Sequence, residues 1–135
     1  MQPISPTLPK VTLDGQKNRP DILDLSGLDF SGVDLNRAKI SWVSLNGANL
    51  SDAELINAVI RHVGLIDANL SDADFTGAEL SYVSLYCANL SNTNLSSARL
   101  TATVMGDAVL TNSNLQGVNI GPHTKFPDGF ELAPP

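Results

Sequence analysis

Apolar residues recur at every fifth position between residues 25 and 120, and the phase never slips. Two residues before each of these 20 centres lies Ala, Val or Leu in 17 cases; Thr93, Thr103 and Ser113 are the exceptions. The other three positions of each unit are mostly Ser, Asn, Asp, Gly or charged. The apolar centres are Leu25, Phe30, Leu35, Ile40, Leu45, Leu50, Leu55, Ile60, Leu65, Leu70, Phe75, Leu80, Leu85, Leu90, Leu95, Leu100, Met105, Leu110, Leu115 and Ile120.

A five-residue period matches neither regular element, since a helix repeats every ~3.6 residues and a strand every ~2. The chain must therefore turn a corner every five residues while it points the same two positions inward. A second period of 20 residues is visible in VSLNGANLSDAEL at 43–55, VGLIDANLSDADF at 63–75 and VSLYCANLSNTNL at 83–95. Four corners then complete one turn, and residues 23–122 make five coils of a solenoid.

The tandem A-(D/N)-L-(S/T)-x unit resembles the pentapeptide-repeat family over about three quarters of the chain. The resemblance implies an all-β fold, a right-handed quadrilateral parallel β-helix with a turn at each corner. The segment TKFPDGF at 124–130 also resembles a tail common in cyanobacterial members of that family.

Three regions follow: an N-terminal flank at 1–22, the repeats at 23–122, and a C-terminal cap and tail at 123–135. A solenoid exposes apolar interior and unpaired backbone at its ends unless a cap covers them. We expect Phe126 and Phe130 to cover one end, and Val11, Leu13 and Ile22 are available for the other. A packed interior of this size should leave no cavity for a substrate.

The charge balance restricts the partners. The chain has 14 acidic and 8 basic residues, a formal net charge of -6. Nucleic acids and anionic membranes both require a basic face, so we expect no nucleic acid and no membrane as partner. Residues 1–22 lack the apolar stretch of a secretory signal, no run is long enough to span a bilayer, and the single cysteine forms no internal disulfide. We therefore expect a cytoplasmic protein.

The 20-residue period aligns acidic residues along one outward edge. Asp34, Glu54 and Asp74 share a column, with Asp52 and Asp72 alongside. Three interpretations are open: turn-forming hydrogen bonds of Asp side chains, a negative docking strip, or a site where carboxylates on neighbouring coils share a hard cation.

The same period gathers aromatic residues in another outward column. Such exposed aromatic and Arg side chains are enriched in binding hot spots, although a ladder that only stabilises adjacent coils is an alternative. The candidate protein-binding residues are Trp42, His62 and Tyr82, with Ile66 and Tyr86 beside them and Arg61 preceding His62.

The residue types needed for catalysis are scarce. His62 and His123 are the only histidines, no His/Cys cluster has metal-ligand spacing, and neither a phosphate loop nor a nucleophile elbow is present. We expect no cofactor, no metal and no enzymatic activity. Cys87 shares a column with Asp67 and Asp107, which should disfavour its thiolate, so we expect an inert free thiol; a disulfide between two molecules is the alternative.

These features predict a rigid, non-enzymatic surface for protein–protein interaction, as a monomer or weak homodimer. The alternative implied by the resemblance is a DNA mimic that binds a type II topoisomerase such as gyrase. Residues 23–122 hold 10 acidic and 4 basic residues, net -6. A duplex of the same ~24 Å length carries about 14 charges, so mimicry is the weaker interpretation. A third interpretation is a structural rod without a specific partner.

Overall fold

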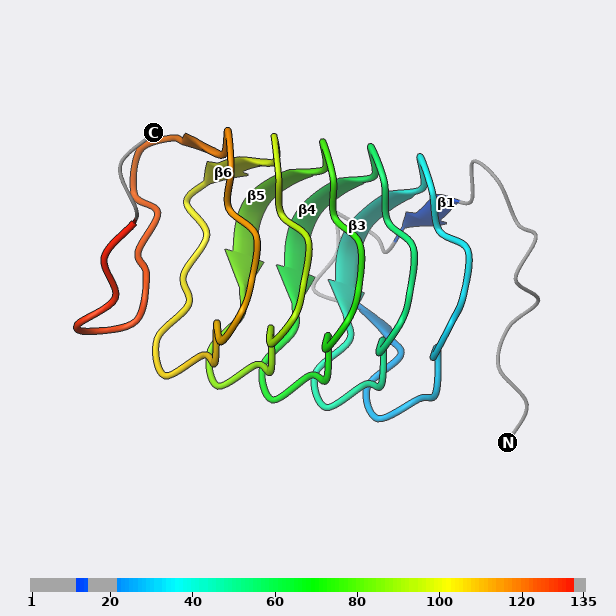
Figure 1. Cartoon of the computed structure of the whole chain (residues 1–135). Helices are drawn as coiled ribbons and strands as arrows, with labels where there is room; N and C mark the ends of the chain where they lie inside the picture. Colours follow the sequence, from blue (N-terminus) through cyan, green and yellow to red (C-terminus); the bar gives the residue numbers. More distant parts are fainter. Residues whose placement is uncertain (1–11, 15–21, 133–135) are drawn as a thin grey trace.

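The computed structural model describes residues 12–14 and 22–132 of the chain. They form a right-handed parallel β-helix whose coils stack along one axis, with β1 and residues 123–132 at opposite ends (Figure 1). The predicted all-β fold class is confirmed. Val11 belongs to the N-terminal residues outside the described part, and no helix long and apolar enough to cross a membrane occurs within the described ranges.

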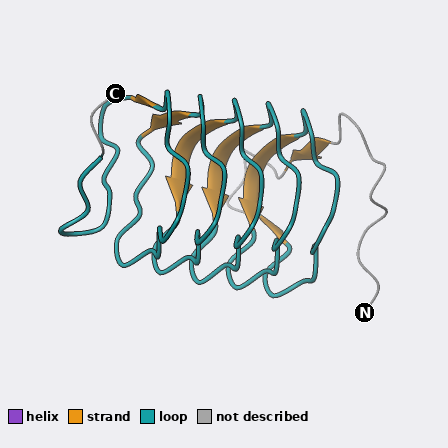
Figure 2. Ribbon diagram, viewed as in Figure 1, coloured by secondary structure: helices purple, strands orange, loops and turns teal. Residues whose placement is uncertain are grey.

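The seven strands make one sheet on one side of the solenoid, and turns and bridges form the rest of each coil (Figure 2). The longest three, β3, β4 and β5, pair in parallel with residue i opposite residue i+20, as in Ile40–Ile60–Leu80. The strands are β1 (Thr12–Asp14), β2 (Leu23–Asp24), β3 (Lys39–Ser44), β4 (Val59–Gly64), β5 (Glu79–Ser84), β6 (Arg99–Thr101) and β7 (Asn119–Ile120).

Each coil is hydrogen-bonded to both of its neighbours. The amide N–H of Leu50 donates to the carbonyl of Asn69 in the next coil at 2.7 Å, and that of Asn69 donates to Ala48 in the preceding one at 2.9 Å. Isolated parallel bridges such as Asp34–Glu54–Asp74 extend this ladder around the faces that lack strands. The 20-residue register is therefore imposed by the backbone as well as by the core.

A left-handed backbone conformation produces each corner. From Gly27 to Gly117, every fifth residue has a φ between 47° and 73°. Glycine adopts this conformation without steric cost, whereas a residue with a side chain is strained in it. Trp42, His62 and Tyr82 nevertheless have this conformation here. The residue three positions before the corner often supports the turn; the Asn69 Oδ1, for example, accepts the N–H of Ser71 at 3.1 Å as the chain approaches Asp72.

The interior is filled by the two inward positions of each unit. Leu50, Leu70 and Leu90 are each at most 1% exposed and stack in one column. Thr93 and Thr103, which break the apolar rule, are buried as well. The Thr93 hydroxyl donates to the carbonyl of Leu90 at 2.7 Å and that of Thr103 to Leu80 at 3.2 Å, so neither polar group is buried without a partner.

The ends of the solenoid depart from the sequence pattern. Of the residues available to cover the first coil, Leu13 packs against the core and Ile22 is 53% exposed. Ile120 is also exposed, because the coil above it is incomplete. Phe126 packs on the core and stacks with Phe130 at a centroid distance of 5.0 Å.

The C-terminal end also departs from the expectation of an interior without cavities. A cavity of about 910 Å³ opens between the last coil and residues 130–132. Its walls include Leu110, Leu115 and Val118, which are centres or inward residues of a coil that has no complete neighbour. The expectation therefore fails at the end of the stack.

Replacing Leu70 with Asp is expected to abolish cooperative unfolding. The side chain is fully buried, and the substitution exchanges about 1.5–3 kcal/mol of apolar burial for a carboxylate without a partner, in a fold that relies on neighbour contacts. Asn92→Asp is the matched control, because it adds the same charge at an exposed corner where Asp52 and Asp72 already occur. Thermal melting followed by circular dichroism measures both. A Leu70→Asp melt within a few degrees of the control contradicts the expectation.

Candidate protein-binding surface

Three aromatic side chains form a continuous stack along one corner of the solenoid. Trp42 and His62 lie with ring centroids 4.0 Å apart and planes 9° apart, and His62 and Tyr82 with values of 4.8 Å and 10°. We call Trp42, His62, Tyr82 and Ala102 the aromatic corner. The sequence pattern placed these residues in one outward column, and the structure brings their rings into contact.

The coil geometry explains this stacking. Each residue occupies the left-handed position of its corner, with φ of 57°, 55° and 56°, so all three side chains leave the backbone in the same direction. Stacked rings contribute roughly 0.5–1.5 kcal/mol per pair beyond the burial of their area. This offsets the steric cost of bulky side chains at positive φ. Trp42 and His62 are half-buried in the stack, whereas Tyr82 at its end is 60% exposed.

Arg61 and Glu79 connect two coils beside the stack. The Arg61 Nη2 lies 2.6 Å from the Glu79 Oε2, and Nε donates to the same oxygen at 2.9 Å. The Arg61 side chain is 54% exposed, so the pair contributes at most about 1 kcal/mol. Its main consequence is electrostatic, because Glu79 neutralises Arg61.

Ile66 and Tyr86 occupy the neighbouring outward column, as the sequence predicted. Both are exposed, Ile66 at 37% and Tyr86 at 47%. The Asn46 Oδ1 accepts the N–H of Ile66 at 2.9 Å. The Tyr86 ring lies over Gly106 so closely that a Cβ there would collide with it. Tyr86 therefore covers a gap in the next coil and does not join the aromatic stack.

Three carboxylates of the acidic edge accept hydrogen bonds from nearby groups of the chain. The Asp34 and Asp74 carboxylates accept the N–H groups of Asn36 and Thr76 at 3.0 and 2.9 Å, and the Glu54 Oε1 accepts the Asn36 amide at 3.1 Å. This is the arrangement expected of turn-forming side chains. Within residues 12–14 and 22–132, no group of three or more His, Cys, Asp or Glu side chains is placed to hold a metal ion.

The other two members of the acidic edge, Asp52 and Asp72, lie at the corner two turns away from Trp42. With four corners per coil, that corner is diagonally opposite the aromatic corner. Both side chains are exposed and take left-handed φ values of 60° and 62°. The two candidate surfaces thus point in opposite directions from one core.

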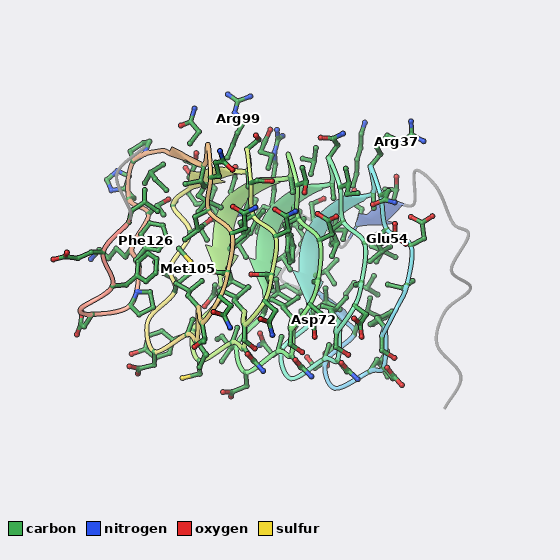
Figure 3. All side chains as sticks on the ribbon, in the orientation of Figure 1. Arg37, Glu54, Asp72, Arg99, Met105 and Phe126 are labelled. Atoms are coloured by element: carbon green, nitrogen blue, oxygen red, sulfur yellow. The ribbon has the colours of Figure 1, made fainter. Side chains whose placement is uncertain are left out.

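Charge is segregated around the solenoid. Residues 23–122 hold 10 acidic and 4 basic residues, of which strands β3 to β6 contain one acid, Glu79, and three bases, Lys39, Arg61 and Arg99. Asp24 lies in β2 of the same sheet, so eight acids and one base, Arg37, remain outside the strands. Arg37 and Arg99 project along the upper edge in Figure 3, and Asp72 lies well below them. The strand side that bends at the aromatic corner is therefore the least acidic surface of the molecule.

Two features of the surface were not found from the sequence. The positive φ at every corner has only a weak signal in the sequence, namely the frequent Gly, Asn and Asp at those positions. The contact between Tyr86 and Gly106 has a clearer signal, because a glycine follows the tyrosine by one coil of 20 residues.

Replacing His62 with Ala is expected to destabilise the protein by about 1–3 kcal/mol, because two ring pairs are lost at ~0.5–1.5 kcal/mol each. Asp67→Ala serves as the control, since Asp67 occupies a left-handed corner of the same coil at φ 59° without a stacked ring. Chemical denaturation of both variants measures the difference. Equal losses for the two variants would show that the stack contributes nothing beyond corner geometry.

The Cys87 thiol is expected to alkylate more slowly than an unstructured cysteine. Partial desolvation, with the carboxylates of Asp67 and Asp107, raises the pKa of this exposed thiol, so less thiolate is present at a given pH. The double substitution Asp67→Asn and Asp107→Asn should speed the reaction with iodoacetamide at pH 8, whereas Asp52→Asn should not. An unchanged rate in the double variant would exclude the carboxylates as a cause.

Comparisons with known proteins address the fold that carries this surface. The family model for pentapeptide repeats matches residues 23–52, 53–91 and 88–120 in 8 copies. The search of curated proteins found no match. Among solved structures, the pentapeptide repeat protein Rfr23 from the cyanobacterium Cyanothece 51142 is 22% identical, with a TM-score of 0.52 over 87% of this chain and 89% of that chain.

Two further structures are similar in sequence. The pentapeptide repeat protein AT2G44920 from the Arabidopsis thaliana thylakoid lumen is 31% identical over 71% of this chain and 60% of that chain, with a TM-score of 0.26. The protein alr5209 from Nostoc Pcc 7120 is 25% identical over 91% of this chain and 92% of that chain, with a TM-score of 0.34. Because the family model matches most of the coils, including all those of the aromatic corner, the chain belongs to the pentapeptide-repeat family.

Proposed function

We propose that this protein is a non-enzymatic scaffold that binds another protein through its aromatic corner and the strand side next to it. The observation that carries the proposal is the stack of Trp42, His62 and Tyr82, which ends in a tyrosine that is 60% exposed. Aromatic side chains are costly to leave in water, and they dominate binding energy when a partner covers them.

Rigidity supports the same proposal. The three rings leave corners whose flanking strand residues pair with the coils on both sides, so a partner meets a surface that is already ordered. Binding then costs little side-chain entropy, which favours affinity from a small contact area. Ile66 and Tyr86 enlarge the apolar area next to the stack, and Arg61 contributes its exposed guanidinium.

Mimicry of duplex DNA, as an inhibitor of a type II topoisomerase, has less support. A mimic needs acidic groups along the surface that the enzyme contacts, and its total charge should approach that of the duplex. Here the acids are spread over three sides, and Asp34 and Asp74 already accept backbone hydrogen bonds. We expect no inhibition of gyrase supercoiling at micromolar concentrations of the protein.

The scaffold proposal is tested by affinity capture followed by binding measurements with the purified partner. Replacing both Trp42 and Tyr82 with Ser is expected to weaken binding at least about tenfold, because each is a candidate hot spot of ~2 kcal/mol. Replacing both Asp52 and Asp72 with Asn is the matched control at the opposite corner and should leave binding unchanged. Loss of the partner only in the Asp variant would contradict the proposal and assign binding to the acidic edge.

A further inference from the structure

The aromatic stack stops one coil before the end of the solenoid. The fourth position of the aromatic corner is Ala102, which has the same left-handed backbone as the three ring-bearing residues, with φ 47°. The methyl group of Ala102 extends less far from the backbone than the aromatic side chains at the other three positions. One face of Tyr82 is in contact with His62, and above the other face the corner offers only this methyl group.

The cap continues the corner beyond Ala102. In the stacked coils, paired residues are 20 apart, but Val104 pairs with Lys125, 21 residues later. This single extra residue places His123, at φ 62°, in the corner position above Ala102. The carbonyl of the preceding Pro122 accepts the N–H of Ala102 at 2.8 Å, which fixes the cap against this corner. The column therefore reads Trp42, His62, Tyr82, Ala102 and His123.

The interval between Tyr82 and His123 is two coil spacings, about 9.6 Å from the ~4.8 Å separation of paired strands. The stacked pairs within the corner are separated by 4.0 and 4.8 Å, so the interval accommodates one planar group. The adjacent column provides a contrast, because the gap at Gly106 is filled by the ring of Tyr86. At Ala102 the chain supplies no ring of its own, and Tyr82 is left 60% exposed.

The charges around this interval select its occupant. Arg99 and Lys125 lie on the strand and the cap segment that flank Ala102, and both are exposed. Glu79 faces the same side, but Arg61 neutralises it. A guanidinium group would be repelled by this surface, whereas an uncharged ring carried by an acidic segment would be attracted.

We propose that the interval above Tyr82, with Ala102 as its base, is a receptor site for one aromatic side chain from an acidic segment of the partner protein. The inserted ring stacks on Tyr82 and completes the column. The proposal rests on the proposed function and deepens it, by assigning the partner's chemistry and the position of its principal contact.

The test uses the whole protein with its Ala102 methyl group labelled for NMR. The probe is the peptide acetyl-Asp-Asp-Trp-Asp-Asp-amide, with the analogue that has Ala in place of Trp and the analogue that has Lys in place of Asp as controls. We expect a saturable upfield shift of the Ala102 methyl from the ring current, with a dissociation constant on the order of 1 mM for so small a probe. The two control peptides should bind at least about tenfold more weakly.

A variant whose own side chain fills the interval above Tyr82 tests the site directly. Ala102→Phe adds a ring at a corner that already tolerates rings in three coils, and it should abolish the response of the Tyr82 resonances to the peptide. Ser97→Phe adds the same ring at another left-handed corner, φ 60°, and should leave binding intact. Equal binding of the Trp peptide to Ala102→Phe and to the unmodified protein overturns the site.

The remaining outcomes separate this proposal from the previous one. If the captured partner is lost on Tyr82→Ser but retained by Ala102→Phe, the binding surface stands and the receptor site is wrong. If both variants retain the partner, both proposals fail. A shift of Ala102 with oligothymidine that exceeds its shift with the Trp peptide overturns the protein partner in favour of single-stranded nucleic acid. Absence of any saturable shift below about 10 mM peptide also overturns the site.

Discussion

The 20-residue register of backbone hydrogen bonds between coils is the constraint on which the rest of this structure depends. Each coil donates to and accepts from both of its neighbours, so residues 20 apart share a direction as well as a neighbour. The register stacks Leu50, Leu70 and Leu90 inside and Trp42, His62 and Tyr82 outside. Core and surface are therefore two products of one periodicity, and an error in phase would disrupt both.

The side chain at a left-handed corner can vary for binding without disturbing the packing that stabilises the coil. A corner side chain points away from the core, so its identity has little influence on the packing of Leu and Ala within the coil. Gly47, Asp67, Cys87 and Asp107 occupy equivalent positions of one corner with little in common chemically. The aromatic corner differs from this tolerant background, since its rings interact with each other and its last ring remains open to solvent.

The sequence predicted the repeating part of the structure well, because every five-residue unit has apolar or small residues at the same two inward positions. The shared column of Trp42, His62 and Tyr82 followed from the same count. Prediction failed where the repetition ends: Ile120 fits the apolar pattern but is exposed, since no complete coil covers it. It also missed the position of His123, because a single additional residue in the cap shifts the count by one.

That additional residue also limits how such a protein can lengthen. Pairing at an offset of 21 brings Lys125 opposite Val104 and leaves the following residues out of step with the coils. Another turn appended after it would have to place its large side chains in the shifted register. Duplication of whole 20-residue blocks within residues 23–122 keeps the original register, so the rod increases there in steps of one coil while the cap stays unchanged.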